Sequence, residues 1–116
     1  MASDPTRNSP LSPATLHILL ALAGGNLHGY GIIQEVARNT DGRYRLGPGT
    51  LYDNLQRLLD QGIVEEHSPR ALGDDPRRRY YRLSRFGRGL LATEIARLED
   101  LVREARLHLK PRPERA

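Results

Sequence analysis

The stretch GPGTLYDNLQRLLDQG, residues 47–62, predicts a helix that has a bare entrance and one polar face. Its apolar positions recur at helical spacing and form a core stripe: Leu51, Leu55, Leu58 and Leu59. Its polar positions fall in the opposite stripe: Thr50, Asp53, Asn54, Arg57 and Gln61. Gly47, Pro48 and Gly49 leave little bulk at the first turn, where free N–H groups can bind a phosphate. We therefore expect the polar stripe to face outward, toward an external partner.

Elements predicted on both sides make this helix the third in the chain. Ser12 followed by Pro13 predicts the start of a first helix. The buried face of that helix is expected to contain apolar residues at helical spacing: Leu16, Leu19, Leu20 and Ala23. A second helix is expected to begin near residues 28–30 and to end at 39–42. Residues 63–67 and 79–83 are predicted strands joined by a turn-rich loop, and Ser84 caps a long last helix. This order is typical of a winged helix-turn-helix, a mainly α fold with a small β-hairpin.

The last helix carries apolar residues spaced alternately by four and by three positions: Leu91, Ile95, Leu98, Val102, Ala105 and Leu109. This spacing is that of a heptad seam of almost three repeats. The seam runs beyond what three short helices can cover, so we expect a second copy of the chain to pack against it.

Charge and composition narrow the function classes. The 116 residues carry a net charge of +4, and Lys110 is the single lysine, so the basic charge is almost all arginine, which suits phosphate and guanine. The absence of cysteine excludes disulfides and suits a reducing compartment. No apolar run is long enough to span a bilayer and no secretory signal is recognisable, so we expect a cytoplasmic protein. The four histidines are scattered and no phosphate-binding loop is present, so we expect no enzyme, no metal and no cofactor.

Three motifs carry a family resemblance: HGY at 28–30, GTLY at 49–52 with leucines following, and RRYYRLS at 78–84 with Gly87. Together they resemble the PadR family of bacterial transcriptional regulators, over roughly residues 11–109. The single long C-terminal helix is similar to the short subfamily. The resemblance implies a cytoplasmic homodimer that binds a palindromic operator, usually as a repressor, and is often released by a small molecule. The chain departs from the family pattern at Ser84, where threonine is common, and lacks the tryptophan that some relatives use to stack a drug.

The expected DNA-binding residues come from the second helix, the polar stripe and the arginine-rich loop: Tyr30, Gly49, Thr50, Tyr52, Asn54, Arg57, Arg77, Arg78 and Arg79. Asparagine can pair with adenine and arginine with guanine in the major groove. The third helix contains two aspartates and one arginine, so we expect the loop arginines to supply more of the attraction to DNA.

Some alternatives stay open at this point. Thr50, Asn54 and Arg57 either read bases or contact phosphates, and Tyr52 either touches a phosphate or packs against the first helix. The expected domains are a disordered tail at 1–10, a DNA-binding domain at 11–84, a dimerisation helix at 85–109 and a frayed tail at 110–116. The rival function is that of a winged-helix scaffold for protein interactions that does not bind DNA.

Overall fold

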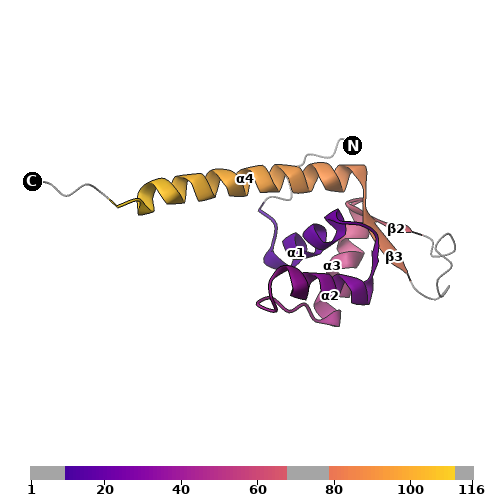
Figure 1. The fold of residues 1–116 in the computed structure, drawn as a ribbon. Coiled ribbons are helices and arrows are strands. Elements are labelled where there is room, and N and C mark those ends of the chain that lie inside the picture. Colours follow the sequence, from indigo (N-terminus) through magenta and orange to yellow (C-terminus); the bar gives the residue numbers. More distant parts are fainter. Residues whose placement is uncertain (1–9, 68–78, 112–116) are drawn as a thin grey trace, which may run out of the picture.

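The computed structural model describes residues 10–67 and 79–111. The helices are α1 (Pro13–Ala23), α2 (Gly29–Asn39), α3 (Pro48–Asp60) and α4 (Arg85–Leu109), and the strands are β1 (Leu27–His28), β2 (Val64–His67) and β3 (Tyr80–Leu83). In Figure 1, α1, α2 and α3 cluster beside the β2–β3 hairpin, and α4 extends well past them. This arrangement confirms the predicted mainly α fold. The predicted loop at 68–78 lies outside the described residues, as do the predicted tails at 1–10 and 110–116 except for Pro10, Lys110 and Pro111.

A third strand extends the predicted hairpin. The antiparallel sheet has the order β1-β3-β2, with Leu27 opposite Tyr81 and His28 opposite Tyr80. A strand of two residues is too short to show an alternating pattern, so no periodicity indicated it. Pairing with β1 attaches the root of the hairpin to the start of α2.

Three of the four helices begin with a side-chain cap. Ser12 Oγ accepts a hydrogen bond from the Thr15 N–H at 3.2 Å, and Ser84 Oγ accepts one from the Gly87 N–H at 2.9 Å. His28 Nδ1 accepts from the Gly31 N–H at 3.0 Å and so caps α2. These caps satisfy donors that a helix leaves unpaired at its N-terminus and fix where each helix begins.

The core forms where α1 packs among α2, α3, β3 and α4. The sequence prediction of the buried face of α1 was wrong in part, because Ile18, Ala21 and Leu22 are buried with Leu19 whereas Leu20 is 36% exposed. Helix α1 is apolar on nearly every side, so periodicity alone could not select the face that packs inward.

The first turns of α4 belong to this core. Leu90 and Leu91 are buried, and a β-carbon at Gly87 would overlap the carbonyl oxygen of Ile63. The Ser84 N–H donates to that same oxygen at 3.0 Å. The assignment of Leu91 to a dimer seam is therefore corrected, because its side chain packs against the core of its own chain. The seam that the chain leaves uncovered begins one helical turn later.

We predict that Gly87→Ala lowers the free energy of unfolding by about 1–3 kcal/mol, because the added methyl group forces α4 away from Ile63. Gly89→Ala is the matched control, since a β-carbon there meets no described atom within 4 Å. Loss of a helical glycine should stabilise that variant by roughly 0.5–1 kcal/mol. Denaturant unfolding of both variants measures the difference, and equal effects would contradict the close packing at Gly87.

Candidate nucleic-acid interface

The outward face of α3 is polar, as its spacing predicted. Its exposed residues are Thr50, Tyr52, Asp53, Gln56, Arg57 and Asp60. Gln56 was left out of the predicted stripe, and its Nε2 donates to Asp60 Oδ1 at 3.1 Å. The face combines hydrogen-bond donors and acceptors, and its three charged residues, Asp53, Arg57 and Asp60, give no net positive charge, so the face is better suited to hydrogen bonding with base edges than to attracting phosphates.

Asn54 does not lie on this face. Its side chain is only 8% exposed, and its Oδ1 accepts from Thr15 Oγ1 at 2.8 Å. The prediction that Asn54 faces outward to read a base is therefore wrong, because the residue packs between α3 and α1. Sequence spacing misplaced it because Asn54 sits at the border of the core stripe, next to Leu55. A buried threonine on a facing helix is the partner that a polar residue in this position requires.

Arg57 lies next to Asn54 and stays partly in solvent. One guanidinium nitrogen, Nη2, donates to Asn54 Oδ1 at 2.5 Å and approaches Thr15 Oγ1 at 3.3 Å. The arginine is therefore held toward α1 at one nitrogen, while its other nitrogens make no hydrogen bond to any described residue.

The entrance of α3 differs from that of the other helices. Gly47 is its N-cap, with φ of −82°, and no side chain of the described residues caps the first turn. A β-carbon at Gly47 or Gly49 would meet no described atom within 4 Å. Neither backbone strain nor internal packing therefore requires glycine here. The small residues leave the first-turn N–H groups open to a ligand outside the chain.

Two tyrosines lie beside this entrance. The Tyr52 ring is half exposed and its hydroxyl lies against Gly29, where an added β-carbon would overlap it. Tyr52 therefore packs against the start of α2, and not against the first helix as one alternative had it. Tyr30 is 64% exposed on the first turn of α2. The contact of Tyr52 with Gly29 brings the start of α2 next to α3.

The base of the β2–β3 hairpin holds arginines in ion pairs. Arg79 Nη1 lies 3.3 Å from Glu66 Oε1, and Arg82 Nε lies 3.2 Å from Glu65 Oε1. Residues 77–88 contain six arginines and no acid, so local sequence alone did not reveal these ion pairs. The antiparallel register brings the glutamates across from β2. The alternation of side chains along the two predicted strands could have indicated that these arginines and glutamates pair. Exposed pairs of this kind are worth about 0–1 kcal/mol, so a phosphate can replace the carboxylate. Arg77 and Arg78 lie outside the described residues.

Tyr81 contributes no charge to this surface. Burial raises the pKa of its hydroxyl above the ordinary value, and the nearby Glu66 carboxylate raises it further. The phenol is therefore neutral near pH 7. The arginines and glutamates set the charge of the hairpin base.

Comparison with known proteins identifies the fold and the family. The sequence family described as the transcriptional regulator PadR-like family matches residues 18–93. The chain belongs to this family. PadR-like proteins are DNA-binding transcriptional regulators and not enzymes.

Relatives and solved structures agree with this membership. The chain is 39% identical over 89 residues to the transcriptional regulator Rv3488 of Mycobacterium tuberculosis, covering 77% of this chain and 78% of the relative. A transcriptional regulator from Clostridium thermocellum is similar in structure, with a TM-score of 0.69 and 25% identity over 96% of this chain and 99% of that one. Bacillus subtilis PadR, solved in complex with operator DNA, shares the fold at a TM-score of 0.64 and 20% identity, over 92% of this chain and 54% of that one.

The bare entrance of α3 gives a direct prediction for this PadR-like regulator. Gly49→Ala should leave the free energy of unfolding unchanged or slightly raised, because the methyl group meets no described atom. The same change should weaken DNA binding about tenfold, because it separates the first-turn N–H groups from a phosphate. Thermal unfolding and fluorescence anisotropy with labelled DNA measure the two effects. Unchanged DNA affinity would mean that no DNA backbone approaches Gly49.

Proposed function

We propose that this PadR-like regulator binds a palindromic operator as a homodimer and acts as a repressor that a small molecule releases. The observation that carries the proposal is the open, glycine-lined first turn of α3 beside a polar outward face. A fold of this kind is solved on operator DNA in the B. subtilis relative. The chain uses residues 11–84 for DNA and the distal part of 85–109 for pairing with its partner.

In this proposal, α3 enters the major groove. Thr50 and Arg57 are the candidates for contact with base edges or nearby phosphates, while Gly49, Tyr30 and Tyr52 lie against the backbone at the entrance. The hairpin arginines Arg77, Arg78 and Arg79 bind phosphates beside the groove. The exposed pair between Arg79 and Glu66 supports this role, because a phosphate competes for the same guanidinium.

The uncovered part of α4 supports a homodimer. Ile95 is 38% exposed, Val102 49% and Leu109 81%, with Leu98 half-buried and Ala105 exposed between them. Apolar surfaces arranged along one helix face favour a second copy over permanent exposure to water.

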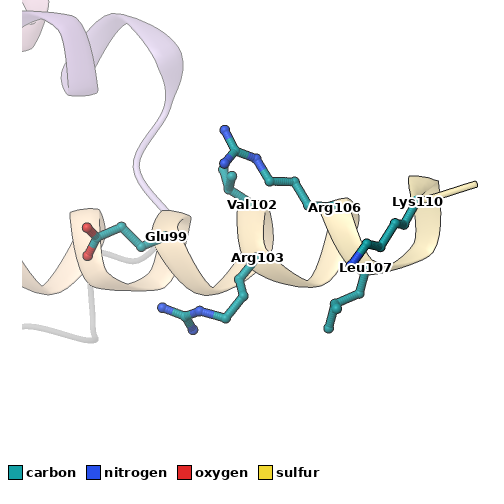
Figure 2. A pocket seen from close by; sticks show the side chains of 6 residues that line it. All are labelled: Glu99, Val102, Arg103, Arg106, Leu107 and Lys110. Carbon is teal, nitrogen blue, oxygen red and sulfur yellow. The ribbon is translucent and has the colours of Figure 1, made fainter.

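A shallow groove on α4 supports an effector site near this interface. Figure 2 shows that all of its lining side chains come from the distal part of this one helix: Glu99, Val102, Arg103, Arg106, Leu107 and Lys110. One helix cannot enclose a ligand, so a second chain would have to close the groove. Its apolar floor and three basic side chains suit an organic anion with an apolar body.

The alternative is a winged-helix scaffold that binds proteins instead of DNA. The two functions separate in one experiment, selection of bound sequences from a random DNA pool. A palindromic consensus supports the operator proposal, whereas retention of no DNA at low salt supports the scaffold. Among residues 10–67 and 79–111, no helix has the length and apolar character of a membrane span.

The salt dependence of binding tests the hairpin arginines. We expect Arg79→Ala to weaken binding to operator and to unrelated DNA alike and to lower the slope of log K against log salt by about 1. Arg77→Ala and Arg78→Ala should behave in the same way. Arg103→Ala is a matched control on α4, and its slope should equal that of the wild type. Unchanged slopes for all three hairpin variants would remove the hairpin from the interface.

A charged residue placed in the exposed seam of α4 tests whether the chain forms a homodimer. Val102→Asp should convert the protein to a monomer, because each buried valine is worth about 1.5–3 kcal/mol and the two-fold axis doubles the loss. Operator affinity should fall with it, since one chain contacts only one half-site. Ala96→Asp places the same charge outside the seam and should remain dimeric. Light scattering distinguishes the two, and a dimeric Val102→Asp protein would contradict the interface.

A further inference from the structure

We propose that Thr15 and Asn54 hold the Arg57 side chain in the conformation that contacts DNA. Residues buried between α1 and α3 thereby tune the affinity for DNA without touching DNA. The inference rests on the proposed function, because it requires α3 to contact DNA. It concerns a polar cluster that joins Arg57, a predicted interface residue, to Thr15, which no prediction placed near DNA. The cluster is small, buried and directed to a single partly exposed cation.

The hydrogen bonds of the cluster converge on the side chain of Asn54. Ser12 Oγ donates to Thr15 Oγ1 at 2.9 Å, and Thr15 Oγ1 donates to Asn54 Oδ1 at 2.8 Å. Asn54 Nδ2 donates to the Thr50 carbonyl oxygen at 2.8 Å. Arg57 Nη2 supplies the second donor to Asn54 Oδ1, at 2.5 Å. The carbonyl oxygen of the Asn54 amide thus accepts two hydrogen bonds, one from each side.

The orientation of the Asn54 amide follows from these partners. A guanidinium only donates and a backbone carbonyl only accepts, so a flipped amide would face Arg57 with its NH₂ group and Thr50 with its oxygen. Both contacts would then be lost. Thr15 is 5% exposed and Asn54 8%, so water cannot readily replace the missing partners. The network therefore fixes which atom faces Arg57.

The consequence for Arg57 is a reduced set of conformations. A free arginine side chain loses considerable rotamer entropy when it binds a phosphate or a base. Here one nitrogen is already held against α1, and no described residue accepts a hydrogen bond from the others. An anchored guanidinium can use those remaining donors on DNA with less entropy to lose. The Thr15 hydroxyl belongs to α1 and does not touch DNA in this proposal. Its removal is therefore the best test of the positioning role.

The experiment uses the full chain and an operator selected from a random DNA pool. Thr15→Val removes the hydroxyl but keeps the shape, and Thr15→Ser keeps the hydroxyl. We expect Thr15→Val to weaken operator binding about five- to tenfold and Thr15→Ser to bind within about twofold of wild type. Thr93→Val, the same change on α4, should bind as wild type does. Circular dichroism and thermal unfolding establish that each variant is folded at the assay temperature.

The double variant separates positioning from general stability. In the Arg57→Ala background, Thr15→Val should cause no further loss, because the residue it positions is gone. An equal loss in both backgrounds would overturn the proposal and leave the cluster a purely structural contact. Tighter binding by Thr15→Val would also overturn it, since the cluster would then hold Arg57 away from DNA.

Failure of the proposed DNA-binding function would give a different result from failure of the positioning role. A wild-type protein that selects no DNA would remove both the operator and the positioning role, whatever the variants do. DNA binding by the wild type with additive losses at Thr15 and Arg57 would remove only the positioning role. The two hypotheses therefore fail on separate measurements.

Discussion

Burial of α1 is the constraint on which the rest of this structure depends. The helix has no charged residue between Pro13 and Ala23, and it packs against α2, α3, β3 and α4. Transfer of its leucines and isoleucine from water supplies the favourable free energy that places each neighbour. The few polar groups on α1 then constrain how the neighbouring elements pack, because burying a hydroxyl without a hydrogen bond costs free energy. Thr15 is such a group, and its need for a partner determines how α3 rotates against α1.

The sequence predicted the elements that depend on local rules. Ser12, Ser84, Pro13 and the glycines mark helix ends through hydrogen bonding and backbone conformation, and the structure confirms those ends within a residue or two. The outward position of Thr50, Tyr52 and Arg57 follows from the same helical spacing that buries Leu51 and Leu55.

The sequence failed where a choice depends on a partner far away in the chain. Asn54 is polar yet buried because Thr15, 39 positions earlier, supplies a hydrogen bond. The apolar helix α1 could have turned several faces inward, and only packing selects Ile18 and Leu22. The arginines at the hairpin base meet glutamates through strand register. Each of these features is a long-range pairing, which spacing within one helix or strand cannot reveal.

The close contact between Gly87 and Ile63 has a geometric consequence for the proposed homodimer. Helix α4 has 25 residues and is therefore about 37 Å long, but only its first turns are fixed to the core. A tilt of roughly 5° at that junction would move the far end of the helix by about 3 Å. In a two-fold dimer joined through α4, the same angle sets the separation of the two copies of α3, which DNA requires to be close to one helical repeat. If the chain pairs as proposed, this one backbone contact, which leaves no room for a methyl group, would help to set the half-site spacing, and homologues with a different residue there would be expected to prefer operators of different length.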